Sequence, residues 1–288
     1  MPPRLRTLLI LGRVSNLPTV WSNCLAGWWL GGGGNFWKLP PLLLGVSALY
    51  CGGVFLNDAF DADVDKQRRP SRPIPSGAIT RESVWVWSCG LLAFGTLLLA
   101  FIGLTAGLLA LALLASIIIY DATHKAINAS PWLMGLCRFW VYLIAGATGI
   151  NGVNGWPIWC GAALALYIAG LNSLARREGF RGPLPIWPLL LLFTPVFLAL
   201  LMNVNDAREA ALTLSAVLVL WLALGLRTIF IPSETNVRRI VSRLLAGIVF
   251  VDWLAVGPMA TIPHPLSFGS FIALFTVTLL LQRFVPAV

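Results

Sequence analysis

Residues 40–65 read PPLLLGVSALYCGGVFLNDAFDADVD, an apolar run that continues directly into a cluster of acids. The run 40–57 approaches the length of about 20 mostly apolar residues that a helix needs to cross the hydrocarbon core of a bilayer. The stretch 57–65 then holds four of the eleven Asp and Glu residues of the chain. Carboxylates are costly to desolvate at a membrane boundary. The pattern therefore predicts a spanning helix that ends in a chemically active cluster.

The composition of the whole chain agrees with this membrane setting. Of 288 residues, 58% are hydrophobic and 11% are charged, and the mean hydropathy is +0.83. Soluble domains carry about 25% charged residues, so soluble enzymes, disordered chains and disulfide scaffolds are excluded. The five cysteines are scattered through apolar runs without ligand spacing and are interpreted as small core residues. The chain is predicted to be an integral membrane protein.

Apolar stretches of spanning length recur along the chain, with short Gly- and Asn-rich connections alternating with longer charged ones. Because backbone groups in lipid must be paired internally, the composition predicts an all-α, polytopic membrane bundle of nine or ten transmembrane helices, in one domain over 1–288. The candidate spans are 14–31, 40–57, 83–101, 104–120, 131–150, 156–174, 184–202, 208–231, 240–261 and 265–283.

The basic residues set the expected orientation and explain the net charge of +9. Only Lys38 and Arg208 fall on the face opposite the N-terminus, while Arg138 and Arg227 lie inside predicted spans. Cytoplasmic loops carry an excess of Lys and Arg. The N-terminus and the acidic loop are therefore predicted to be cytoplasmic, and the charge gives no reason to expect a nucleic-acid partner.

The acids near residue 60 have the spacing of a metal site. Asn57, Asp61 and Asp65 recur every four residues, which places them on one helix face. Hard oxygen ligands without His or Cys favour Mg²⁺, which proteins hold with one or two carboxylates together with substrate phosphates. The basic, proline-rich segment KQRRPSRPIPSG follows at 66–77, and arginines grip phosphate oxygens well. A diphosphate with an apolar tail suits this setting; a solvated loop whose acids and bases pair with one another is the alternative.

These residues resemble the UbiA superfamily of intramembrane prenyltransferases. The pattern Asn57-Asp58-x-x-Asp61-x-x-x-Asp65, followed by the 69–77 segment, is similar to the first aspartate-rich motif of that family. Three further segments also resemble this family: 13–23, 120–125 (Tyr-Asp-x-x-His-Lys) and Gly135-x-x-Arg138. The likeness covers most of residues 10–180.

The resemblance implies a helical bundle around a central cavity in which a polyprenyl diphosphate binds through Mg²⁺. Ionisation of the diphosphate leaves an allylic carbocation. A small acceptor molecule, an aromatic ring or another group, then captures this cation. Protein partners are unknown, and the membrane lipids surround the bundle. Three sets of residues are expected on this basis: Asn57, Asp61 and Asp65 for the metal; Asp61, Lys125 and Arg176 for catalysis; and Arg13, Arg72, Lys125, Arg138, Asn172 and Arg176 for the substrate.

The chain departs from the family pattern at the second acidic motif. The end of the sixth predicted span carries Asn172 and Arg176 at the expected spacing, and Glu178 is the only acid nearby. Either Arg176 replaces a second metal as a fixed cation, or the protein binds or helps export a hydrophobic metabolite without transfer. Asp121 is a candidate for the missing acid, although pairing with Lys125 is the preferred interpretation. Asp252, in the middle of the ninth span, is expected to make a hydrogen bond between helices.

Overall fold

The computed structural model describes residues 3–125, 127–176, 186–227, 237–259 and 264–285. Every regular element in these residues is a helix. The α-helices are α1 (Pro3–Leu11), α2 (Leu17–Leu30), α3 (Leu39–Arg68), α4 (Arg81–Ile102), α5 (Leu104–Thr123), α6 (Ser130–Thr148), α7 (Gly155–Ala175), α8 (Ile186–Leu192), α9 (Thr194–Met202), α10 (Asp206–Leu226), α11 (Val237–Val256) and α12 (His264–Phe284), and the short 3₁₀ helices are η1 (Val14–Asn16) and η2 (Phe36–Lys38).

Within the described residues, nine of the ten predicted apolar stretches each overlap one α-helix, which in the stretch 14–31 is preceded by η1, and the tenth overlaps two short α-helices. The stretch 184–202 is divided into α8 and α9 at Phe193. Pro195 has no backbone N–H and cannot bond the carbonyl of Leu191, four residues earlier. The hydroxyl of Thr194 donates to that carbonyl instead, at 2.8 Å. Pro195 thus interrupts the helix, while the carbonyl of Leu191 still accepts a hydrogen bond.

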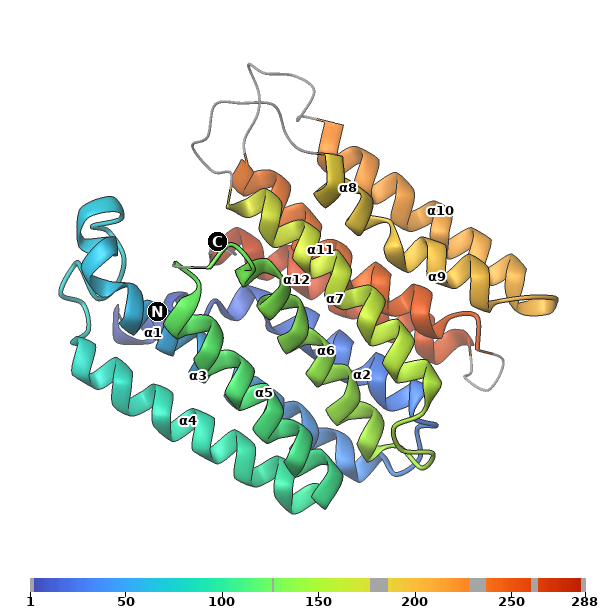
Figure 1. The fold of residues 1–288 in the computed structure, drawn as a ribbon, viewed down its shortest axis with the longest axis horizontal. Coiled ribbons are helices and arrows are strands. Elements are labelled where there is room, and N and C mark those ends of the chain that lie inside the picture. The colour runs from blue at the N-terminus through green and yellow to red at the C-terminus, as the bar shows by residue number, and fades with distance from the viewer. Residues whose placement is uncertain (1–2, 126, 177–185, 228–236, 260–263, 286–288) are drawn as a thin grey trace.

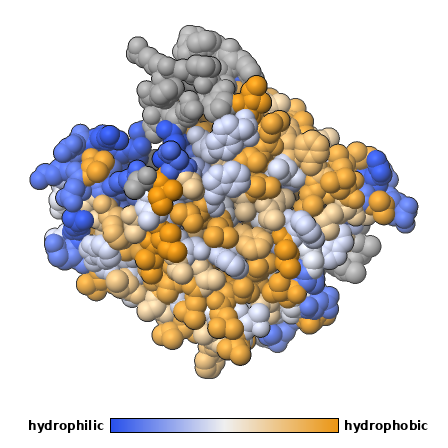
Figure 2. All heavy atoms as spheres, in the orientation of Figure 1, coloured by the Kyte–Doolittle hydropathy of each residue, from blue (hydrophilic) through white to orange (hydrophobic). Residues whose placement is uncertain are grey.

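The outer surface of the bundle is apolar. Five helical segments in the described residues are long and apolar enough to cross a membrane: Phe36–Arg68, Arg81–Ile102, Leu104–Thr123, Gly155–Ala175 and Asp206–Leu226. Phe101 is 93% exposed and Leu104 is 78% exposed. Figure 2 shows an apolar belt across the visible face, with hydrophilic residues gathered toward the ends of the helices. A surface of this kind is solvated by lipid rather than by water.

The interior contains two large apolar clusters that meet at the centre. Helices α3, α4 and α5 lie along one side of the bundle and α8, α9 and α10 along the other, with α6, α7 and α11 between them (Figure 1). One cluster joins α2 through α6, and the second joins α7 through α12 and also includes residues of α2 and α6. Helices α2 and α6, both in the N-terminal half, approach closely where a glycine replaces a larger side chain. A Cβ at Gly27 of α2 would lie 2.6 Å from the carbonyl oxygen of Tyr142 in α6.

Candidate functional site

A hollow of about 210 Å³ lies between the two halves. Aliphatic side chains such as Leu49, Val141 and Ile168 form much of its wall. Polar side chains also enter it from α3, α5, α6, α7 and the segment before α2. These polar lining residues are Arg13, Asn16, Tyr50, Asn57, Tyr120, Asp121, Arg138 and Asn172. An apolar chamber with a few converging polar groups is the ordinary form of a ligand site.

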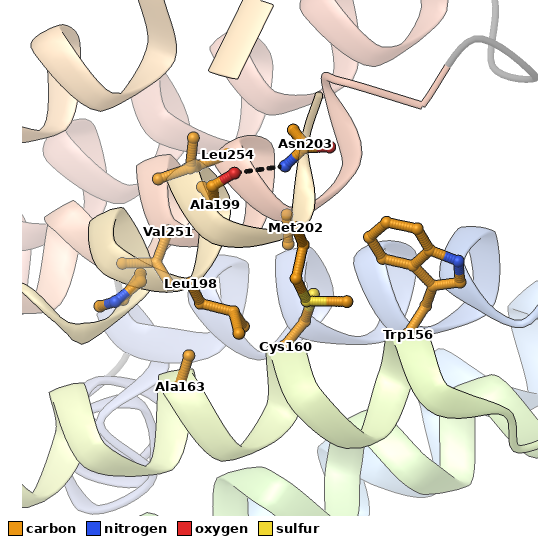
Figure 3. Close-up of a pocket in the computed structure, with 11 residues that line it drawn as sticks. Trp156, Cys160, Ala163, Leu198, Ala199, Met202, Asn203, Val251 and Leu254 are labelled. Atoms are coloured by element: carbon orange, nitrogen blue, oxygen red, sulfur yellow. Dashed lines mark hydrogen bonds between the residues drawn. The ribbon is translucent and has the colours of Figure 1, made fainter. Parts of the chain in front are cut away.

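A second hollow, about 20 Å³, lies between α7, α9 and α11 (Figure 3). Trp156, Cys160 and Met202 line it together with small aliphatic side chains. Its one amide, Asn203, already donates to the carbonyl of Ala199 within the same turn, at 2.8 Å. This pocket lacks a charged group and is an imperfection of packing rather than a candidate site.

The acids of α3 divide between two faces of the helix. Asp58 and Asp65, both 7% exposed, share one guanidinium: Arg72 Nη1 donates to Asp58 Oδ1 at 3.1 Å and to Asp65 Oδ2 at 2.7 Å. At 3.6 residues per turn, positions 58 and 65 are only about 20° apart around the axis, whereas 57 and 65 are about 80° apart. Asp65 therefore faces Arg72 and Asp58. The expectation that it joins Asn57 and Asp61 in one ligand set is not met by this arrangement.

Arg13, which precedes α2, also contacts the face of α3 that carries Asp58 and Asp65. Its Nη2 donates to Asp58 Oδ1 at 3.3 Å, and the residue lines the cavity. The backbone of Arg13 has φ 42° and ψ 48°, a left-handed conformation that is costly for a residue with a Cβ. The Tyr50 hydroxyl donates to the Arg13 carbonyl at 3.4 Å. Strained residues of this kind cluster at functional sites.

Asn57 and Asp61 face the end of α5. Asn57 Nδ2 donates to Asp121 Oδ1 at 3.1 Å. One turn later, Asp61 Oδ1 accepts Lys125 Nζ at 2.5 Å and lies 3.2 Å from His124 Nε2. His124 Nδ1 lies 3.1 Å from the Asp121 carbonyl oxygen, so both ring nitrogens face acceptors. The hydrogen bond with Asp61 raises the pKa of His124 and favours the imidazolium.

The expected pairing of Asp121 with Lys125 is wrong. Lys125 bonds Asp61, and Asp121 lies in the last turn of α5, 4% exposed. Lys125 lies two residues beyond the end of α5 and meets Asp61, whereas Asp121 meets Asn57, one turn earlier on α3. Sequence spacing suggests that Asp121 and Lys125 are close to each other. It does not show that each of them has a different partner on the neighbouring helix α3.

Arg138 points into the cavity, as the sequence predicts. Its guanidinium donates to Asn23 Oδ1 at 2.6 Å and to Thr19 Oγ1 at 3.3 Å, and it lies 5.9 Å from the centre of the Tyr50 ring. Asn23 in turn donates to Asp252 Oδ2 at 2.7 Å. One amide therefore links the cavity arginine to a buried acid.

The predicted role of Asp252 in joining helices is confirmed. Its carboxylate, fully buried in α11, accepts hydrogen bonds from Ser22 and Asn23 of α2 and from the Tyr142 hydroxyl of α6, the last at 2.5 Å. Sequence reasoning did not identify these three donors. The only signal available was the presence of polar residues inside otherwise apolar spans, where each buried polar group requires a partner.

The end of α7 brings one of its two predicted residues to the cavity. Asn172 lines it, with its Nδ2 bonded to the Ile168 carbonyl at 3.0 Å. Arg176 instead reaches the α5–α6 connection, where its Nη1 donates to Ser130 Oγ at 3.0 Å and to the Asn128 carbonyl at 3.3 Å. These contacts hold a loop and do not support the expected catalytic cation. Glu178 lies outside the described residues.

The donor set at the end of α3 and α5 fits Mg²⁺ bound together with a substrate. Asn57, Asp61 and Asp121 offer only oxygen ligands, and Asp121 Oδ2 is buried without a hydrogen-bond partner among the described residues. No three His, Cys, Asp or Glu side chains in that part of the chain are placed to hold an ion by themselves. Mg²⁺ ordinarily completes its shell with water and substrate phosphates. The residues therefore suit a shared site rather than a closed cage.

Solved structures with this fold include several from archaea. The apo structure of a UbiA homolog from Aeropyrum pernix K1 has a TM-score of 0.66 and 18% identity, over 84% of this chain and 96% of that one. A UbiA homolog from Archaeoglobus fulgidus bound to GPP and Mg²⁺ has a TM-score of 0.53 and 15% identity, over 98% of this chain and 100% of that one. At these identities the likeness establishes the fold alone.

Curated relatives share shorter stretches. The digeranylgeranylglyceryl phosphate synthase of Metallosphaera sedula is 34% identical over 96 residues, which are 32% of this chain and 34% of that protein. The synthase of the same name from Methanothrix thermoacetophila is 36% identical over 125 residues, 42% of this chain and 46% of that protein. The chain thus matches about a third to a half of the length of these relatives. The UbiA prenyltransferase family model matches residues 16–286, and the chain belongs to the UbiA prenyltransferase family.

Proposed function

We propose that this protein catalyses the Mg²⁺-dependent transfer of a polyprenyl group from a prenyl diphosphate to a small acceptor within the membrane. The observation that carries the proposal is that Asn57 and Asp121 line a cavity with mostly aliphatic walls, while Asp61, one turn further along α3, pairs with Lys125. The polar end suits a metal-bound diphosphate, and the aliphatic wall suits a prenyl chain.

The residues have separable tasks in this reaction. When bound, Mg²⁺ would neutralise charge on the diphosphate as the bond from its oxygen to the allylic carbon breaks. Lys125 and Arg13 are placed to stabilise the same charge as the diphosphate departs with the electron pair. A nucleophilic atom of the acceptor then bonds to the allylic carbon and loses its proton. Arg72 keeps Asp58 and Asp65 in place beside this centre, and Arg176 fixes the loop that follows Lys125.

The acceptor is proposed to carry a phosphate. The two relatives described above are named as synthases of a glyceryl phosphate that bears prenyl groups. In this chain Arg138 faces the cavity, and within the described residues its guanidinium donates to the neutral oxygens of Asn23 and Thr19. A guanidinium without a direct carboxylate partner is suited to an anionic acceptor. The aromatic acceptor suggested by the sequence is the competing possibility.

The decisive assay uses the purified full chain in lipid with radiolabelled geranylgeranyl diphosphate. Transfer to a prenylated glyceryl phosphate is compared with transfer to an aromatic carboxylic acid, with Mg²⁺ and with EDTA. We expect transfer to the phosphate acceptor only with Mg²⁺. Asp61→Asn should lower the rate at least about 100-fold, a typical effect of removing a group that stabilises transition-state charge. Asp63→Asn, whose side chain is 82% exposed, is the matched control and should leave the rate unchanged.

Retention of a prenyl ligand without transfer to either acceptor, and without dependence on Mg²⁺, would contradict this function. That result would favour the alternative of a protein that binds or helps export a hydrophobic metabolite. The feature that motivates this alternative is the second motif, where the sequence has Asn172 and Arg176 at the expected spacing of the acids.

We further propose ten membrane crossings, in which α8 and α9 together form one crossing and the N-terminus lies in the cytoplasm. Charged connections at 69–80 and after α5 then share the cytoplasmic face with the acids of α3. Cysteines placed at two exposed positions, Trp37 and Glu82, test the orientation in a variant whose five native cysteines are alanine. A membrane-impermeant thiol reagent added to intact cells should label position 37 and not position 82; the reverse pattern would overturn the orientation.

A further inference from the structure

Helix α7 itself brings no carboxylate to the proposed diphosphate site. The last turns of this helix contribute Asn172 to the cavity and contain no acid within the described residues. A Mg²⁺ site is commonly held by one or two carboxylates together with substrate phosphates, and α3 supplies Asp61 as the first. The question is which side chain supplies the second carboxylate beside Asp61.

Asp121 has the placement that this task requires. It lines the cavity from the last turn of α5 and is 4% exposed. Asn57 Nδ2 holds its Oδ1 at 3.1 Å, while its Oδ2 is buried and has no hydrogen-bond partner in the described part of the chain. A buried carboxylate oxygen without a donor costs free energy unless a ligand or a proton satisfies it.

The other acids at this end already have cationic partners. Asp58 and Asp65 are bound to Arg72, and Asp61 Oδ1 is bound to Lys125. Asp121 is held instead by the neutral amide of Asn57. It is therefore the carboxylate with most remaining capacity to bind a cation.

The register of α3 against α5 also brings Asp121 beside Asp61. Asn57 meets Asp121 in the last turn of α5, and Asp61, one turn further along α3, meets Lys125, which lies two residues beyond the end of α5. Residues four apart are neighbours on a helix face. Asn57, Asp61 and Asp121 consequently surround one point between the two helices.

We propose that Asp121 supplies the second acidic ligand of the Mg²⁺–diphosphate site, so that the metal is held between α3 and α5 rather than between α3 and α7. The ligands from the chain are Asp61, Asp121 and the amide oxygen of Asn57, and diphosphate oxygens and water complete the shell. Asp65 belongs to the Arg72 cluster and takes no part. This assignment rests on the proposed function.

Metal binding by the full chain tests the assignment without reference to turnover. Mn²⁺ replaces Mg²⁺ as a paramagnetic probe, and its free concentration is measured by electron paramagnetic resonance in the presence of a non-ionisable thiolodiphosphate analogue of geranylgeranyl diphosphate. Asp121→Asn keeps the shape of the side chain and should weaken Mn²⁺ binding by about 10-fold or more. Asp63→Asn, an acid on the exposed face of α3, should change it less than about twofold.

A rescue variant separates a ligand from a structural residue. Asn172 lines the same cavity, so Asn172→Asp in the Asp121→Asn background restores a carboxylate from α7. We expect recovery of most of the Mn²⁺ affinity in the double variant. If Asp121→Asn does not fold, Asp121→Glu provides the test, because a longer carboxylate keeps the charge and should shift the affinity by about fivefold.

The outcomes distinguish this assignment from the proposed function. If the wild-type chain shows no analogue-dependent Mn²⁺ binding, the proposed function fails and the assignment fails with it. If the wild type binds Mn²⁺ and Asp121→Asn binds equally well, Asp121 holds a proton rather than the metal, and only the assignment is overturned. Unchanged affinity in Asp121→Glu would overturn it in the same way.

Discussion

Arg72 is the residue on which the arrangement of the acidic face depends. One nitrogen, Nη1, holds two carboxylates that are seven positions apart on α3 and are both nearly buried. Removing one partner of a buried ion pair is costly; without Arg72 both carboxylates would lose their shared guanidinium, and Asp58 would keep its contact with Arg13. The guanidinium of Arg72 therefore connects the 69–80 segment to the end of α3.

Arg72→Ala should lower the free energy of unfolding by about 3 kcal/mol, the scale observed when a buried pair loses one member. Unfolding of the protein in mixed micelles by increasing SDS, followed by circular dichroism, measures the change. Arg81→Ala is the matched control, because its partner Asp63 is exposed and such pairs contribute about 0–1 kcal/mol. Equal losses in the two variants would show that the Arg72 cluster is not a buried unit.

At the scale of elements, the close crossing of α2 and α6 positions Arg138 in the wall of the cavity. Gly27 lies against the backbone of Tyr142, and Asn23, one turn earlier on α2, reaches Arg138, one turn earlier on α6. Small residues at such crossings allow helix backbones to approach closely in membranes. The close approach at Gly27 therefore permits the hydrogen bond that positions the cavity arginine.

Gly27→Ala should force α2 and α6 apart and lower the stability by about 2 kcal/mol, within the usual range for overpacking. Gly90→Ala in α4 is the control, since a Cβ there meets nothing within 4 Å, and it should be neutral or slightly stabilising. Thermal unfolding in detergent compares the two variants. A destabilisation of Gly90→Ala equal to that of Gly27→Ala would contradict the role of close contact.

At the scale of the whole molecule, Asp252 joins the two halves of the bundle. It lies on α11 in the C-terminal half, and its donors Ser22, Asn23 and Tyr142 lie on α2 and α6. A buried polar network with all its members satisfied specifies one arrangement of the helices. The same network fixes Asn23, and through it Arg138, in the wall of the cavity.

Asp252→Ala should lower the free energy of unfolding by about 3–5 kcal/mol, because it leaves buried donors without an acceptor. Thr278→Val is a suitable control: that hydroxyl is also buried, but it bonds only the Leu274 carbonyl within its own helix. Its loss should cost less than about 1.5 kcal/mol. SDS titration of both variants, with the fraction folded read from tryptophan fluorescence, gives the comparison. Similar values for the two variants would mean that Asp252 does not couple the halves.

The sequence by itself determined the all-helical class, the approximate positions of α2 to α7 and α10 to α12, and the cluster of acids at the end of α3. These features follow from local quantities, namely the length of apolar runs and the cost of exposing backbone in lipid. Even the break at Phe193 has a local cause, the proline at position 195. The sequence also predicted that Arg138 faces the cavity and that Asp252 bonds between helices.

Only the tertiary structure decided which partners the charged residues take. It paired Lys125 with Asp61 instead of Asp121, gave Asp65 to Arg72, and brought Arg176 to the loop at 127–130. Spacing along one helix defines a face, but a partner depends on the register and rotation of the neighbouring helices, which are set by packing across the bundle. For that reason the acids could be identified from the chain alone, whereas the division of labour among them required the fold.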